Sequence, residues 1–438
     1  MDILKDKVKP IYFKYLVAAS GSAMVVSVFG MVDAMMVGQY HGPVGTAALA
    51  VFAPLWSIIY CLGLLAGIGG SVLFANLRGR GDEAEAQQYF SITVLYGLVL
   101  SAIAVLGVCI FQDELLYFFG ADEELLGLAK LYLKPILFAF PCCVYTSIFS
   151  AYLRNDNNPG LATKAVIVGG IFNCVGDYVC VFVLDLGIRG AGIATSAAQF
   201  VALFVMMGHF LTKKNTLRFV KPVALMKKIG NISLTGFSTA ITDLALGIIG
   251  ILFNRQIMKY LGSDALAVYG IITQVTVFVQ CIAYGTGQAA QPIISQNYGA
   301  GQYSRIRECT RYSIYSAFGM GIFWMALMLA FPNTILNLFM EATPEVAQIA
   351  PKILRTYGLS YVILPFNIFA TYYFQAMMKP NISLTASLAR GAVVSGGMIL
   401  LLPALLGPGS IWYAMLITEI IMAVFGTGFM LRCNKKLV

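Results

Sequence analysis

Four acidic residues lie inside long apolar stretches of this chain: Asp33, Asp177, Asp243 and Glu419. An ionised side chain is costly in such surroundings, and acids within a bilayer usually face a cavity and mark the path of an ion or a proton. Asn173 precedes Asp177 by four residues, so a helix would place both on one face. Carboxylate and amide oxygens are hard ligands that suit Na⁺, and a buried carboxylate can also carry a proton. The residues leave the choice of ion open.

The composition of the chain suits a bilayer better than water. Of its 438 residues, 59% are hydrophobic and 11% are charged, and the mean hydropathy is +0.80. Soluble domains carry about 25% charged residues. The apolar stretches, for example 11–37 and 92–111, are continuous and of spanning length, which favours transmembrane helices over a β-barrel.

We therefore expect an all-α integral membrane protein with twelve transmembrane helices in two six-helix lobes. The apolar runs place these helices at residues 11–37, 46–76, 89–111, 126–153, 161–184, 188–211, 232–258, 265–294, 308–331, 351–377, 381–405 and 409–431. A basic connection at 212–230 separates an N-terminal lobe, 1–211, from a C-terminal lobe, 231–438.

The distribution of basic residues predicts the orientation of these helices. Of the 29 Lys and Arg residues, 21 fall in the loops on the side of the two termini, and seven fall on the opposite side. Positively charged loops stay in the cytoplasm, so both termini are predicted to be cytoplasmic, in the cell membrane. These loops account for the net charge of +9 without a nucleic-acid partner.

Four of the polar residues are predicted to lie at similar depth in the outer half of the bilayer. Asp33 lies about 7.5 Å from the outer end of its helix, Asp177 about 12 Å and Thr195 about 10 Å, and Asn173 is one turn deeper than Asp177. Each also has a structural explanation: Asp33 could be solvated, Asn173 and Asp177 could bond neighbouring groups, and Thr195 could bond its own helix. As a set on separate helices they favour an ion site.

The two halves of the chain repeat each other. Ala48–Val51 recurs as Ala265–Val268, 217 residues later, and Pro159 corresponds to Pro380, 221 residues later. With six helices in each copy, both copies have the same orientation and are related by a pseudo-two-fold axis along the membrane normal. Such parallel repeats are typical of carriers that work by alternating access.

Several segments resemble the multidrug and toxic compound extrusion (MATE) family, in its prokaryotic form. They are Val32–Gly38 in the first helix, Gly79–Asp82 after the second, Arg154–Pro159 after the fourth, and Asn173, Asp177 and Gly190–Thr195 in the fifth and sixth. Their order and spacing are more specific than any one motif, and the N-terminal half carries the clearer matches.

The resemblance implies an antiporter that exports organic cations and amphiphilic drugs, driven by inward movement of Na⁺ or H⁺. It implies an ion site formed by Asp33, Asn173, Asp177 and Thr195, with Tyr132 as a neighbour. Two features depart from parts of the family: the first helix has no proline near residues 18–21, and no carboxylate lies between residues 351 and 378.

The C-terminal half contributes weaker candidates. Asp243 and Glu419 are single carboxylates, and Arg390, which also falls within a predicted helix, is a possible partner for Glu419. The eighth predicted helix adds a polar series: Gln274, Gln280, Tyr284 and Gln288. These side chains could line a substrate cavity or hydrogen-bond neighbouring helices.

Two other classes of function are less favoured. A lipid-linked saccharide flippase of the same superfamily would need several basic residues in its cavity, whereas Arg255 and Arg390 are the two arginines we take as candidates for the interior of the spans, and acids dominate the N-terminal lobe. An enzyme is disfavoured because the sequence has no metal-ligand cluster or nucleophile motif, and His41 and His209 have no partner at ligand spacing. We expect no cofactor, a small-molecule substrate, the lipid bilayer as surroundings, and a monomer.

Overall fold

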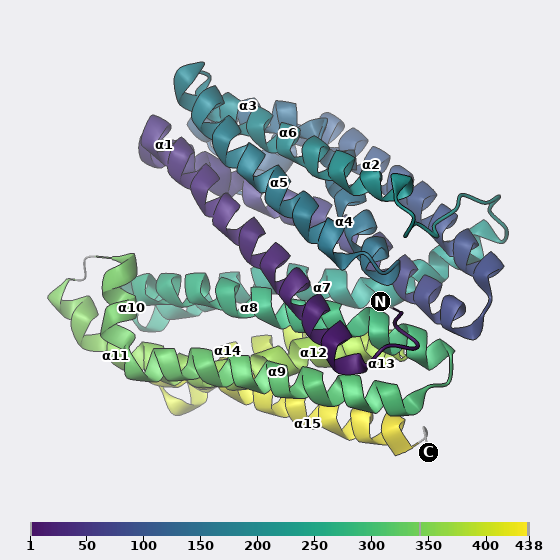
Figure 1. Ribbon diagram of the computed structural model, residues 1–438. Helices are drawn as coiled ribbons and strands as arrows, with labels where there is room; N and C mark the ends of the chain where they lie inside the picture. The colour runs from purple at the N-terminus through teal and green to yellow at the C-terminus, as the bar shows by residue number, and fades with distance from the viewer. Residues whose placement is uncertain (1, 341–342, 436–438) are drawn as a thin grey trace. The chain divides into compact units, whose positions relative to one another are not determined.

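The computed structural model describes residues 2–340 and 343–435, without the side chains of Pro43, Glu124, Asp243, Leu246, Asn434 and Lys435. In this part of the chain all regular secondary structure is helical (Figure 1). Eleven helices there are long and apolar enough to span a membrane, or twelve when one bent pair is counted as a single span. The predicted all-α class with about twelve spans is confirmed.

The chain forms two compact units. The first contains Gly21–Ala240 together with residues 2–5, and the second contains Asp6–Ser20 together with the chain from Ile241 onward. The start of the first helix thus packs with the second unit, so the units do not coincide with a division at residues 211 and 230. That division into lobes and linker stays a prediction.

Helix α1 (Val8–Arg80) contains the first two spans, Val8–Gly42 and Val44–Arg80. The sequence predicts a loop at 38–45, but the spans meet at a single non-helical residue, Gly42, with φ of 65°. Glycine adopts this left-handed conformation without a Cβ clash, so one residue suffices for the turn. Helix α2 (Glu83–Phe118) follows, and the Asp82 side chain caps it by accepting a hydrogen bond from the Glu85 amide.

The fourth span is broken. Helices α3 (Glu123–Leu137) and α4 (Phe140–Asn155) meet at an angle of 55°, so the predicted continuous helix at 126–153 is wrong. Pro135 and Pro141 stand on the two sides of the break. Proline removes a backbone donor and clashes with the preceding turn, which explains why the helix stops here.

The rest of the first unit consists of α5 (Pro159–Tyr178), the π-helical turn η1 (Val179–Val183), α6 (Gly187–Met207), the short η2 (Gly208–Leu211) and the start of α7 (Leu225–Tyr260). Helices α5 and α6 pack along each other, and α6 also packs on α3 and α4 (Figure 1). These contacts surround the polar residues of α5 with neighbouring helices.

In the second unit, α8 packs against α9 and α12 (Figure 1). The elements are α8 (Gly262–Gly299), α9 (Tyr303–Ala330), α10 (Pro332–Phe339), α11 (Pro344–Gly358), η3 (Leu359–Val362), α12 (Leu364–Ala376), α13 (Pro380–Leu388), η4 (Ala389–Val394), α14 (Ser395–Leu406), η5 (Pro408–Tyr413) and α15 (Ala414–Lys435). The apolar pattern of the sequence does not predict the short helix α10, whose eight residues are too few to span a bilayer.

Candidate functional site

Asp33 and Tyr132 meet in the first unit. Asp33 belongs to α1 and Tyr132 to α3, and the Tyr132 hydroxyl donates a hydrogen bond of 2.9 Å to Asp33 Oδ2. Tyr132 is buried, with its ring edge-on to Phe52. This packing fixes the direction of the hydroxyl. Tyr132, which the sequence predicted only as a neighbour of the site, therefore contacts Asp33 directly.

Asp177, Asn173 and Thr195 form a second group of contacts. Asn173 Nδ2 donates to Asp177 Oδ1 on the same helix and to Thr195 Oγ1 on α6, each over 3.3 Å. Asp177 is fully buried and Asn173 nearly so. The shared helix face predicted from their spacing is therefore present, and the amide joins α5 to α6.

The two groups belong to one site. Tyr132 also interacts with Thr195, and the charges of Asp33 and Asp177 act on each other. Asp33 Oδ1 and Asp177 Oδ2 are buried without a hydrogen-bond partner. Among the residues that the structure describes, neither acid forms an ion pair with a lysine, arginine or histidine. All five predicted residues thus come together around two carboxylates for which this described part of the chain supplies no cation.

Close helix packing positions this site. A Cβ atom at Gly192 would lie 2.6 Å from the Tyr132 carbonyl oxygen and 2.8 Å from the Pro135 ring. Only glycine therefore permits α6 to approach α3 this closely, and Thr195 follows Gly192 by one turn. Ser196 strengthens the contact by donating to the Pro135 carbonyl oxygen over 2.9 Å.

A further set of contacts holds the end of the first span near Gly42. The Tyr40 hydroxyl donates to Asp185 Oδ1 over 2.5 Å, and His41 Nε2 accepts a bond of 3.0 Å from the Ile188 amide. These bonds attach the end of the helix that carries Asp33 to the connection between α5 and α6. The sequence offers no signal for them because about 145 residues separate the partners.

In the described part of the second unit, the candidate residues form no comparable group of acids. On α8, Gln280, Tyr284 and Gln288 are partly exposed at successive turns and share a face, while Gln274 is exposed. Their role in a substrate cavity stays a prediction. The side chain of Asp243 lies outside the described part of the structure.

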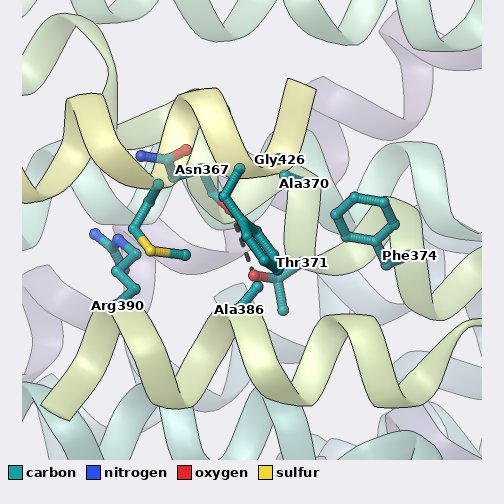
Figure 2. A pocket seen from close by; sticks show the side chains of 9 residues that line it. Asn367, Ala370, Thr371, Phe374, Ala386, Arg390 and Gly426 are labelled. Atoms are coloured by element: carbon teal, nitrogen blue, oxygen red, sulfur yellow. Dashed lines mark hydrogen bonds between the residues drawn. The ribbon is translucent and has the colours of Figure 1, made fainter. Parts of the chain in front are cut away.

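Glu419 is paired with Arg390, as its predicted partner. Arg390 Nη2 donates to Glu419 Oε1 over 2.6 Å and Arg390 Nε over 3.0 Å, and Asn367 Nδ2 donates to Glu419 Oε2 over 2.6 Å. Arg390 and Asn367 also line a small cavity together with Thr371 and Phe374 (Figure 2). Asn367 was not among the predicted site residues, although an amide within an apolar segment is a signal that the sequence offers.

A comparison with known protein families identifies the chain. The MatE family model matches residues 18–179 and 238–395. The chain belongs to the MatE family. The two matched ranges correspond to the two copies of the internal repeat, and the first contains Asp33, Asn173 and Asp177.

Individual relatives of this MatE protein match over most of their length. It is 22% identical over 408 residues to the multidrug export protein MepA of Staphylococcus saprophyticus, covering 92% of the chain and 89% of MepA. It is 25% identical over 377 residues to the probable multidrug resistance protein YoeA of Bacillus subtilis, covering 82% and 80%. The solved outward-facing structure of a multidrug resistance MATE family transporter matches with a TM-score of 0.92 at 20% identity, over 99% of this chain and 98% of that one. The structural match shows that they share a fold.

Proposed function

We propose that this MatE protein is a secondary antiporter that exports organic cations and amphiphilic drugs from the cell, driven by inward movement of Na⁺ or H⁺. The observation that carries the proposal is the pair of carboxylates, Asp33 and Asp177, that share a site in which the described residues supply no counter-cation. The names of MepA and YoeA, a multidrug export protein and a probable multidrug resistance protein, support drugs as the cargo.

In this mechanism the first-unit site binds the coupling ion. Two uncompensated negative charges in a water-poor site repel each other, so a cation or proton that enters lowers the free energy of the conformation that encloses it. Asp33 Oδ1 and Asp177 Oδ2 supply free acceptor atoms, and the hydroxyls of Tyr132 and Thr195 lie beside them. An ion drives alternating access only through different affinities for the two states, and these two acids provide such a difference if one state exposes them to water.

The flippase alternative has less support. A diphosphate cargo requires a cavity with surplus positive charge. In the second unit the buried Arg390 is neutralised by Glu419, and the first-unit site is acidic. These charges favour the antiporter over the flippase.

We also propose that the protein is a transporter rather than an enzyme, that it is active as a monomer, and that both termini lie in the cytoplasm.

Dye efflux from proteoliposomes tests the proposal. Ethidium-loaded vesicles receive a Na⁺ gradient or a pH gradient separately, and the wild type is expected to respond to at least one. We expect Asp177→Asn and Asp33→Asn to reduce gradient-driven efflux to the rate of protein-free vesicles, because the carboxylate charge that binds the ion is removed.

The matched control is Asp264→Asn, the same chemical change at an exposed residue in the first turn of α8, which should transport like the wild type. Wild-type efflux by Asp177→Asn would overturn the ion site. Transfer of a labelled lipid-linked saccharide between leaflets, without ethidium efflux, would instead favour the flippase.

A further inference from the structure

We propose that residues 211–227, which join α6 to α7 and are called the basic connector here, form a binding site for anionic phospholipids. The connector belongs to the first unit and starts at the end of one candidate span, Gly187–Leu211, and reaches into the next, Leu225–Tyr260. Both of its ends therefore lie at the level of the lipid headgroups. The proposal does not depend on the transported ion or substrate.

The connector carries uncompensated positive charge. It has no acidic residue, and it contains five exposed basic side chains: Lys213, Lys214, Arg218, Lys221 and Lys227. None of these five forms an ion pair in the described part of the chain. The nearby acids are paired elsewhere, Glu83 with Arg78 and Glu85 with Lys228. Basic clusters next to spanning helices attract anionic headgroups.

Large apolar side chains are exposed among these charges. Leu211 is 92% exposed, Phe219 64% and Met226 78%, and Val223 is also exposed. Acyl chains and glycerol backbones accept such side chains, whereas water does not. A soluble phosphate or an acidic peptide would account for the basic residues alone. The combination of charge and apolar surface favours a lipid.

Hydrogen bonds to α2 hold the middle of the connector in place. Gln87 donates to the Thr216 carbonyl oxygen and accepts from the Arg218 amide, each over 2.8 Å. One turn along α2, Ser91 Oγ accepts from the Val220 amide over 2.8 Å. Between these bonds Leu217 is buried, only 3% exposed. The backbone is therefore already ordered, and lipid binding does not require folding of a loose loop.

A buried carboxylate fixes the connector at one further point. Asp156 accepts hydrogen bonds from the Thr216 amide over 2.9 Å and from the Thr216 hydroxyl. Arg78 and His209 hold the same carboxylate, over 3.0 and 2.7 Å. The basic side chains on either side of Thr216 thus project from a backbone that is bonded to α2 and to Asp156 at the end of α4.

Native mass spectrometry of the purified full-length protein tests the site. The protein is titrated with phosphatidylglycerol or with phosphatidylcholine of identical acyl chains, and bound lipids are counted. We expect the wild type to retain more phosphatidylglycerol than phosphatidylcholine. In a variant with Lys213, Lys214, Arg218, Lys221 and Lys227 all changed to Gln, the ratio of bound phosphatidylglycerol to bound phosphatidylcholine should fall at least about threefold.

The matched control removes the same charge from five exposed basic residues outside the connector: Lys134, Arg189, Arg255, Lys259 and Lys352, each changed to Gln. It should keep the preference for phosphatidylglycerol.

A third variant, with Leu211, Phe219 and Met226 changed to Ser, should bind less phosphatidylglycerol although its charge is unchanged. Equal losses in the connector and control variants would overturn the proposal, as would complete displacement of the lipid by millimolar inorganic phosphate. Unchanged melting temperatures verify that each variant is folded.

Discussion

The two units differ in how the acidic side chains within their spans are compensated. In the first, Asp33 and Asp177 share a site with two unpaired oxygens and no cation partner in the described residues. In the second, Glu419 receives a two-bond contact from Arg390 and a further bond from Asn367. A buried charge without a partner raises the free energy of the folded state, and a bound cation or proton would lower it. A carboxylate that is already paired with an arginine has no such need for an ion. The difference explains why we assign ion coupling to the first unit.

The internal repeat makes this comparison direct. Pro159 and Pro380 begin corresponding helices, 221 residues apart, and the same offset relates Thr146 to Asn367 and Gly169 to Arg390. In the first unit Thr146 donates a weak bond of 3.4 Å to Gln199, whose counterpart is near Glu419. The Thr146–Gln199 contact of the first copy thus corresponds to the Asn367–Glu419 contact of the second, and the arginine that neutralises Glu419 has a glycine, Gly169, as its counterpart.

The largest effect is expected from making the second unit resemble the first. Arg390→Met leaves Glu419 buried without a cation, which should reduce the free energy of unfolding by about 3–5 kcal/mol. The double variant Arg390→Met with Glu419→Leu should recover most of this loss, because no charge remains buried. Thermal unfolding in detergent measures both. If the double variant were no more stable than the single one, the ion pair would not be what the second unit requires.

A smaller effect is expected at Asp156, a first-unit carboxylate that is compensated. It lies between two spans and accepts bonds from Arg78, His209 and Thr216. Asp156→Asn loses the charge that strengthens these bonds and should destabilise the protein by about 1.5–3 kcal/mol. Asp82→Asn, at an exposed helix cap, is the control and should change stability by no more than about 0.5 kcal/mol. Equal melting temperatures for wild type and Asp156→Asn would contradict the contribution of the charge.

The same carboxylate predicts how stability depends on pH. Burial acts to raise the pKa of Asp156, but the hydrogen bonds from His209 and Thr216 and the charge of Arg78 outweigh it, so the pKa lies below its usual value. The folded protein then binds this proton less readily than the unfolded chain, whose aspartate pKa is about 3.9. The stabilisation is complete above that pH and is lost as the pH falls through the lower, folded pKa. Melting temperatures between pH 6 and about 3 should therefore fall more steeply for the wild type than for Asp156→Asn.

The smallest effect concerns the hydroxyl that orients Asp33. Tyr132→Phe removes one hydrogen bond and keeps the buried ring. The loss of this bond should weaken binding of the coupling ion by about 1 kcal/mol, which is a roughly fivefold lower apparent affinity. The concentration of Na⁺ or H⁺ that gives half-maximal efflux measures this change. Tyr145→Phe, which removes a hydroxyl bonded to the Val94 carbonyl oxygen, is the matched control. A similar shift in both variants would show that the Tyr132 hydroxyl has no specific role at Asp33.

The sequence alone was enough to establish the class of the fold and to predict the residues of the first-unit candidate site. Apolar runs of spanning length are a local property, and the bilayer admits few backbone arrangements, so helix number and type follow from composition. Acids such as Asp33 and Asp177 stand out for the same reason, because a charge in an apolar run is costly wherever its partners are. The spacing of Asn173 and Asp177 also predicted their shared face.

Only the tertiary structure decided which of these side chains meet and which are neutralised. The Arg390–Glu419–Asn367 contacts join three helices, and the bonds of Asp156 to His209 and Thr216 cross 53 and 60 residues. Sequence predicts how polar residues recur along one helix, but not the rotation at which neighbouring helices pack. That rotation depends on close contacts such as Gly192 on Tyr132, and it decides which buried acid is paired with an arginine and which has no cation partner among the described residues.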